Sequence, residues 1–170
     1  FVGLKTGEPD ELDTFEKLYQ AYRTQVEYAV DICARAHAVE YTVEEKLGSY
    51  LFVSALFDGC LESGKSYLEA VKYKGGQIEI FGLTNTADSL LAIRKLVYER
   101  RLFSLRELVA ILDRNFEGYE DVRKILLEMP KFGNDNHEAD SMAQKLSDHI
   151  SKHTWEAARK VGFNMYNVVN

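Results

Sequence analysis

Apolar side chains recur every three or four residues in the first part of the chain, which is the spacing of an amphipathic helix. They share one face from Phe15 to His37, and charged residues occupy the opposite face. Asp13 can cap the start of this helix, with Glu16 at the position that completes a capping box. The pattern therefore predicts one long helix that ends near residue 39.

A second capping-box pattern, Thr42 with Glu45, predicts that another helix starts shortly afterwards. The stretch 47–61 is apolar on most sides, whereas a helix on the surface of a small protein keeps one polar side. We therefore expect one helix here that is buried within a larger body. In the isolated chain it would leave an apolar patch exposed, which promotes association.

The remaining pattern predicts shorter elements separated by Gly and Pro. Alternating polar and apolar residues predict strands at 77–81 and 163–169. Asn85 and Ser104 are predicted helix caps, the second with Glu107 in a capping box. Helices are expected over 66–71, 85–97, 104–112, 119–127 and 136–160, with Pro130 and Gly162 as stop signals. The predicted fold is mainly α with two or so short strands.

Composition limits the class of partner. The chain has 170 residues, a net charge of −6 and 46% hydrophobic residues, which suits a single domain over 1–170. An acidic surface repels a phosphate backbone, so we expect no nucleic-acid partner. No apolar run reaches the roughly 20 residues that a spanning helix needs, so we expect no membrane partner either.

The cysteines and the chain ends suggest a compartment and a context. Cys33 and Cys60 are too few for a disulfide framework and form no CxxC pair. We expect both to be buried as small hydrophobes, in a protein of the reducing cytoplasm. The chain begins at Phe1 without Met or a signal peptide and ends at Asn170 after a β-prone run. We expect both ends to be cuts in a longer protein.

Three stretches could carry chemistry, and each has a simpler structural interpretation. Cys60 lies near Glu62, but it falls on an apolar helix side without a basic neighbour that would lower its pKa. His149 and His153 have the i,i+4 spacing of metal ligands, without the glutamate of HExxH and without an evident third ligand. Residues 134–138 resemble a calcium loop but lack its Gly and its bidentate Glu. We expect a buried thiol, two half-buried histidines and a helix start.

Several sequence blocks, in order, resemble the pyruvate formate-lyase family of glycyl radical enzymes. The segment NTADSLLAIRKLVY at 85–98 is similar to the family's N-x-ADSL-x-AI-K-KLV-F segment, with Arg94 in place of the usual lysine. The other similar blocks are KTGEP at 5–9, TFE at 14–16, SALFDGCLESGK at 54–65, NFEGYE at 115–120 and PKFGND at 130–135. The spacing of the blocks is also similar, so the resemblance extends over nearly the whole chain.

The resemblance implies a ten-stranded α/β barrel that shelters a thiyl-forming Cys in a GCVE-like motif and a radical Gly in an RVxGY-like motif. This sequence has neither motif, and Cys60 matches a later, non-catalytic Cys of the family. We therefore assign no catalytic, cofactor-binding or metal-ligating residue and expect this segment, taken alone, to be structural and inactive. The implied parent is a lyase, dehydratase or acyltransferase of the formate acetyltransferase type that cleaves C–C, C–O or C–N bonds anaerobically.

The resemblance also implies partners: a radical-SAM activating enzyme that installs the glycyl radical, a second copy in a homodimer, and a small-molecule substrate. Pyruvate, a diol, a choline-like amine, a hydroxyproline and an arylacetate all remain open as substrates. A stand-alone helical interaction module is the alternative, and it accounts equally well for the capping boxes and helical stripes. A third hypothesis, a metal-dependent hydrolase that uses His149 and His153, would require a third ligand.

Overall fold

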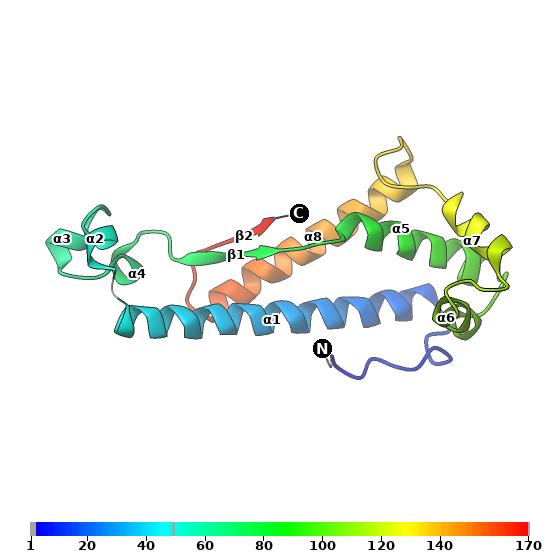
Figure 1. Cartoon of the computed structure of the whole chain (residues 1–170), viewed down its shortest axis with the longest axis horizontal. Helices are drawn as coiled ribbons and strands as arrows, with labels where there is room; N and C mark the ends of the chain where they lie inside the picture. Colours follow the sequence, from blue (N-terminus) through cyan, green and yellow to red (C-terminus); the bar gives the residue numbers. More distant parts are fainter. Residues whose placement is uncertain (1–2, 49, 170) are drawn as a thin grey trace. The chain divides into compact units, whose positions relative to one another are not determined.

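The computed structural model describes residues 3–48 and 50–169, so Phe1, Val2, Ser49 and Asn170 lie outside the described residues. Helices dominate the described part and are accompanied by two short strands, which confirms the predicted secondary-structure class (Figure 1). The elements are α1 (Phe15–Leu47), α2 (Leu51–Ser54), α3 (Cys60–Ser63), α4 (Tyr67–Ala70), β1 (Gly75–Glu79), α5 (Leu83–Ile93), the π-helix η1 (Arg94–Glu99), α6 (Leu105–Asp113), α7 (Glu120–Leu127), α8 (His137–Lys160) and β2 (Met165–Val169).

The chain divides into two compact units. Unit 1 consists of residues 1–26 and 81–149, and unit 2 consists of residues 27–80 and 150–170. Helices α1 and α8 each contribute residues to both units. None of the helices in the described residues is long and apolar enough to cross a membrane.

Two apolar clusters of described residues stabilise unit 1. The first joins α5 to α8 through Ala87, Leu90, Met142, Ala143 and Leu146, and side chains from the start of α1 pack against it. The second joins the end of α5 and η1 to Met129 beyond α7. Both clusters use residues at helical spacing, so the apolar stripes that the sequence predicts for these helices face each other.

Local sequence signals set several helix ends in unit 1. The capping box at Ser104 is confirmed, because its hydroxyl accepts from the Glu107 backbone while the Glu107 carboxylate accepts from the Ser104 backbone. The predicted cap at Asn85 is wrong, since α5 already begins at Leu83. Gly82 precedes it at φ 81°, a left-handed conformation that favours glycine.

The predicted boundary in α1 is wrong. The helix does not stop near residue 39 but continues to Leu47, and Thr42 lies inside it instead of capping a new helix. The Thr42 hydroxyl donates to the Ala38 carbonyl at 2.8 Å, a back-bond within the helix that competes with capping.

The single helix predicted over 47–61 is also wrong. The segment instead contains the short helices α2 and α3, separated by turns. Gly59 has φ 84° immediately before α3, so a left-handed glycine interrupts the helical path.

The predicted burial of Cys33 is wrong, because this residue is exposed on α1. Its neighbour Ala34 lies on the buried side of the helix, and adjacent helical residues point about 100° apart. Cys60 is buried, as predicted.

Strands β1 and β2 form a parallel pair in unit 2. Gly75 pairs with Met165 at one end and Glu79 with Val169 at the other, so each strand lies within one or two residues of its predicted range. Glycine is required at position 75, because a Cβ there would lie 1.2 Å from the Met165 carbonyl oxygen. The Tyr41 hydroxyl donates a hydrogen bond to the Gly75 carbonyl at 2.6 Å, which links the strand pair to α1.

Candidate functional site

Cys60 is the first residue of α3 and is only 3% exposed. It lines a hollow of about 400 Å³ in unit 2, together with Ser54, Lys65 and Glu69. The Ser54 hydroxyl there accepts from the Tyr67 backbone at 3.0 Å, so it fixes the start of α4. Burial keeps the thiol from reagents in solution, which agrees with the structural interpretation of Cys60.

His149 and His153, both in α8, each contact a partner on α1. In unit 1, the Arg23 Nε donates to His149 Nε2 at 3.4 Å. In unit 2, His153 Nε2 and an Asp31 carboxylate oxygen lie 3.0 Å apart. Both histidines are half-buried, as predicted. Among residues 3–48 and 50–169, His, Cys, Asp and Glu form no group of three that could hold a metal ion, so the hydrolase hypothesis gains no ligand set.

The acidic stretch 134–138 starts α8. Asn136 Oδ1 accepts from the backbone nitrogens of Glu138 and Ala139, both at 3.2 Å, which is helix capping. The Glu138 carboxylate is bound by Lys95 at 2.7 Å and by Arg94 at 3.1 Å. The Lys95 hydrogen bond and the charges of both cations lower the Glu138 pKa. The side-chain oxygens of Asn136 and Glu138 thus have partners within the fold.

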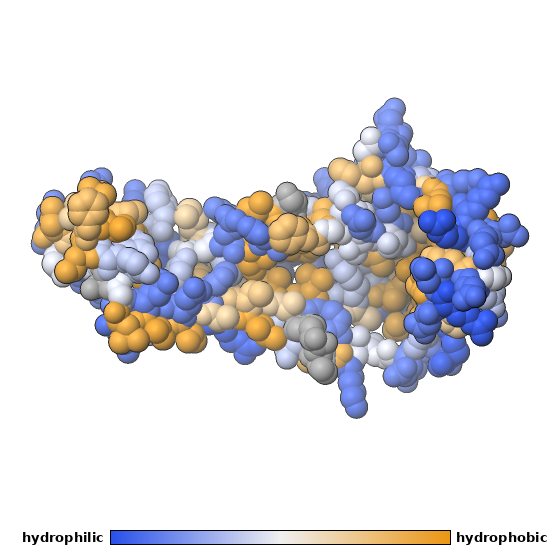
Figure 2. Space-filling view, in the orientation of Figure 1, coloured by the Kyte–Doolittle hydropathy of each residue, from blue (hydrophilic) through white to orange (hydrophobic). Residues whose placement is uncertain are grey.

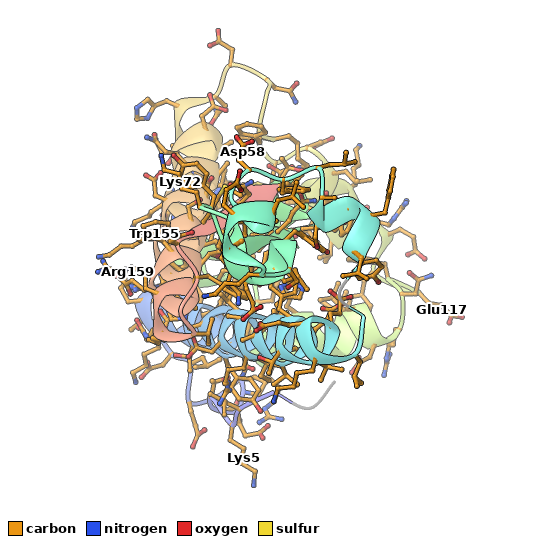
Figure 3. The ribbon with its side chains drawn as sticks, turned by 90° about the vertical axis from the view of Figure 1, so that its left-hand side faces the viewer. Lys5, Asp58, Lys72, Glu117, Trp155 and Arg159 are labelled. Atoms are coloured by element: carbon orange, nitrogen blue, oxygen red, sulfur yellow. The ribbon has the colours of Figure 1, made fainter. Side chains whose placement is uncertain are left out.

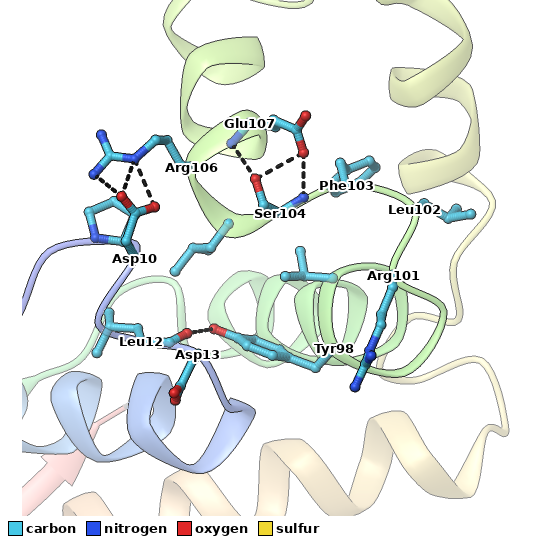
Figure 4. Close-up of a pocket in the computed structure, with 13 residues that line it drawn as sticks. Asp10, Leu12, Asp13, Tyr98, Arg101, Leu102, Phe103, Ser104, Arg106 and Glu107 are labelled. Carbon is cyan, nitrogen blue, oxygen red and sulfur yellow. Dashed lines mark hydrogen bonds and ion pairs between the residues drawn. The ribbon is translucent and has the colours of Figure 1, made fainter.

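A hollow of about 500 Å³ in unit 1 lies between the N-terminal segment and the turn from η1 into α6 (Figure 4). The Arg106 guanidinium holds Asp10 at 2.6 to 2.8 Å and lowers its pKa through that hydrogen bond and its charge. The Tyr98 hydroxyl donates to the Leu12 carbonyl at 2.7 Å. Asp10, Arg106 and Tyr98 are therefore engaged in fixing the N-terminal segment.

Two of the sequence blocks that resemble the family contact each other. Asp88, in the segment 85–98, accepts from the Phe132 backbone at 2.8 Å, and Phe132 belongs to the PKFGND block. The Lys131 ammonium of that block donates to the carbonyls of Leu126 and Met129, at the end of α7. These contacts fix a loop to two helices, so the residue types in these blocks have a structural reason. Sequence reasoning missed the pair of Asp88 and Phe132, because nothing local marks a contact 44 residues apart.

An aromatic cluster fixes the strand pair of unit 2. The Tyr166 hydroxyl and His37 Nδ1 share a hydrogen bond of 2.6 Å, and Phe163 packs against the rings of Tyr41 and Tyr166. Burial, and then the neighbouring Cys33 and Tyr41, raise the pKa of Tyr166 to about 12. A tyrosine with a raised pKa stays neutral and serves as a packed hydrogen-bonding group.

The side chains described above hold backbone segments and helices in place. Comparison with known proteins shows to which family the chain belongs. The model of the family described as pyruvate formate lyase-like matches residues 1–165. The chain belongs to this family. The resemblance to glycyl radical enzymes of the pyruvate formate-lyase type is thereby confirmed.

Relatives of the pyruvate formate lyase-like family are much longer than this chain. A trans-4-hydroxy-L-proline dehydratase of Clostridioides difficile is 33% identical over 147 residues, which are 85% of this chain and 19% of the relative. An isethionate sulfite-lyase of Desulfovibrio desulfuricans is 33% identical over 157 residues, 88% of this chain and 18% of the relative. A solved structure concerning 1,2-propanediol dehydration in Roseburia inulinivorans is 28% identical with a TM-score of 0.89, over 98% of this chain and 22% of the other.

Proposed function

We propose that this chain is a structural segment of a glycyl radical enzyme that dehydrates or cleaves a small substrate by anaerobic radical chemistry. The observation that carries the proposal is the family match over residues 1–165, within relatives of which the chain spans about a fifth. The relatives named above are dehydratases and lyases, which supports those reaction types for the parent and gives no support to the acyltransferase subtype.

The residues of this chain have a clear task in such an enzyme. A thiyl radical abstracts hydrogen from many C–H bonds, so the residues around it must be rigid and must exclude water. The contacts of Asp88 with Phe132, of Tyr98 with Leu12 and of Tyr41 with Gly75 each fix a loop or strand to a helix. In the proposed parent, the helices would form the outer layer of the barrel, and β1 and β2 would be two of its strands.

The proposed parent would act in the cytoplasm as a homodimer, with a radical-SAM activating enzyme that installs the radical on a glycine outside this segment. The reactive cysteine and glycine belong to the GCVE-like and RVxGY-like motifs that this sequence lacks. The segment alone would therefore catalyse no turnover.

Anaerobic electron spin resonance of the full-length gene product, after treatment with its activating enzyme, tests this proposal. We expect a glycyl radical signal in the parent and none in the 170-residue chain given the same treatment. A substrate screen would then compare trans-4-hydroxy-L-proline, isethionate, 1,2-propanediol and glycerol, with product formation measured. A gene without GCVE-like and RVxGY-like motifs in the flanking reading frame, together with no radical signal, would contradict the proposal and favour the interaction module.

A further inference from the structure

Tyr166 on β2 and His37 on α1 form a close phenol–imidazole pair in unit 2. The Tyr166 hydroxyl and His37 Nδ1 lie 2.6 Å apart, and the two rings meet edge to face with their centres 5.7 Å apart. Tyr166 is only 6% exposed, so its side chain is largely shielded from bulk water. A neutral His37 that carries its proton on Nε2 presents Nδ1 as the acceptor of the phenol hydrogen bond.

The neighbouring strand leaves room for this pair. Gly76 of β1 lies opposite Tyr166 in the strand register. A Cβ at position 76 would lie 2.9 Å from the Tyr166 ring and 3.3 Å from His37 Nδ1. A larger residue at this position would therefore push against both partners. Glycine in the interior of a strand is typical of such a close approach, and here it admits the hydrogen-bonded pair.

The acceptor distinguishes Tyr166 from other tyrosines with a hydrogen-bonded hydroxyl. The Tyr41 hydroxyl donates to the Gly75 carbonyl at 2.6 Å, and the Tyr98 hydroxyl donates to the Leu12 carbonyl at 2.7 Å. A backbone carbonyl accepts a hydrogen bond but does not take up a proton at neutral pH, whereas an imidazole does. Tyr166 therefore has a base as its partner, while Tyr41 and Tyr98 do not.

This difference matters when a tyrosine loses an electron. Removal of one electron from a phenol makes its hydroxyl strongly acidic, so the electron leaves readily only if a base takes up the proton. Burial raises the pKa of Tyr166 to about 12, so the neutral phenol is the form that is oxidised at neutral pH. A base must lie within about 2.6–3.2 Å of the group whose proton it takes. His37 Nδ1 meets this requirement.

We propose that Tyr166 and His37 form a redox-active pair that gives one electron to an oxidising radical at unit 2. The Tyr166 O–H bond breaks, the proton forms an N–H bond at His37 Nδ1, and the phenol becomes a neutral phenoxyl radical beside an imidazolium. The oxidant is a one-electron oxidising radical from solution, and the electron reduces it. Only the role of the pair, which is to intercept stray radicals in a radical enzyme, rests on the proposed function.

Exposed aromatic side chains are the first points of attack for such a radical. Trp155, the only tryptophan in the sequence, lies on α8 and is 46% exposed (Figure 3). Tyr50 is 52% exposed and belongs to the region where apolar side chains gather at the surface over the end of α1 and over α2 and α3 (Figure 2). Trp155 belongs to unit 2, as Tyr166 does. An oxidised Trp155 can therefore take an electron from Tyr166 within the same unit.

Pulse radiolysis of the 170-residue chain with the azide radical tests the proposal. The azide radical takes an electron from Trp155 and becomes azide, and the oxidised indole loses its N–H proton to water. When Tyr166 returns the electron, the indole regains a proton from water. Time-resolved absorption follows the decay of the indolyl radical and the growth of the phenoxyl radical. All samples carry Cys33→Ser, because the exposed Cys33 thiol is a competing electron donor.

In the chain with Cys33→Ser alone, phenoxyl growth should match indolyl decay and should not depend on protein concentration. His37→Gln keeps a hydrogen-bond acceptor but not a base. We expect it to slow the growth by roughly 100-fold or more, the usual contribution of a positioned base. Tyr166→Phe should abolish this phase. Tyr41→Phe is the matched control and should retain it, because Tyr41 donates over the same 2.6 Å to a carbonyl.

The outcomes separate the pair from a merely structural contact. Circular dichroism checks that each variant is folded, and His37→Asn replaces His37→Gln if that variant is not. Phenoxyl growth that is absent from the chain with Cys33→Ser alone, or unchanged in the His37 variant or in Tyr166→Phe, would overturn the proposal. Loss of the growth in Tyr41→Phe would overturn it as well. Because these measurements use the 170-residue chain, their result is independent of whether the parent forms a glycyl radical.

Discussion

Two apolar stretches of similar character end up in opposite environments. In unit 1, residues 83–99 bury Leu90 and Leu96 against other residues of the same unit. In unit 2, residues 43–61 leave Leu51 and Phe52 largely exposed. Apolar content alone therefore does not decide burial, because a helix face is buried only where the chain supplies a complementary face. The first stretch has that face within this chain, and the second does not.

The largest expected effect is the difference in stability between a Leu→Ala change in the buried core of unit 1 and one in the exposed stretch of unit 2. Leu146→Ala opens a cavity in the unit 1 cluster and should lower the free energy of unfolding by about 2–5 kcal/mol. Leu51→Ala makes the same chemical change at an exposed position and should alter it by less than about 0.5 kcal/mol in the isolated chain. Urea unfolding of both variants measures the difference. Similar losses in the two variants would break the comparison.

The comparison also explains what the sequence could predict. Ser104 with Glu107 and the stop at Gly162 were correct, because the groups that satisfy these helix ends lie within a few residues. The helix over 47–61 was wrong, because an apolar run does not show where the chain turns, as it does at the left-handed Gly59 before α3. The pairing of β1 with β2 could not be derived, since about 90 residues separate the strands and no local signal sets their register.

For the candidate functional residues, too, predictions that depend on neighbouring residues succeeded and contacts with distant residues were missed. The helix-start interpretation of 134–138 followed from Asn136 and needed only its neighbours. Partners distant in sequence were missed: His37 with Tyr166, and Asp88 with the Phe132 backbone. Exposure of Cys33 was missed as well, because an apolar stripe does not show which of two adjacent residues faces the core.

A second prediction tests a local signal in unit 1. Ser104→Ala removes the capping hydroxyl of α6 and should cost about 1 kcal/mol of stability. Ser89→Ala is the matched control, because Ser89 is exposed within α5 and its hydroxyl only donates back to the Asn85 carbonyl. The midpoint of thermal unfolding should be lower for Ser104→Ala than for Ser89→Ala. Equal midpoints would mean that tertiary packing, not the cap, fixes the start of α6.

A third prediction concerns the alkaline side of the pH range in unit 2. The pKa of Tyr166 is raised to about 12, above the value of about 10 for an unfolded tyrosine. A raised folded-state pKa gives a contribution to stability that is complete below about pH 10 and is lost as the pH rises through about 12. Ultraviolet titration of phenolate should show a late-titrating component that decreases by one tyrosine in Tyr166→Phe. An unchanged titration in that variant would contradict the assignment.

The smallest effect is expected at the N-terminal contact of unit 1. Arg106 lowers the pKa of Asp10, so this exposed pair contributes at pH values above the ordinary range of an aspartate and loses its contribution as the pH falls through the lowered pKa. Arg106→Gln should return the Asp10 titration midpoint upward towards its ordinary value, as followed by carboxyl chemical shifts. A midpoint that does not move in this variant would show that the contact is absent in solution.

The central claim is that residues 50–64 require covering polypeptide that lies outside this segment. Hydrogen–deuterium exchange of backbone amides, compared between the 170-residue chain and the full-length parent, tests it most directly. The account predicts fast exchange over residues 50–64 in the isolated chain and strong protection in the parent, with residues 139–150 of α8 protected in both. Equal protection of residues 50–64 in the two proteins would contradict it.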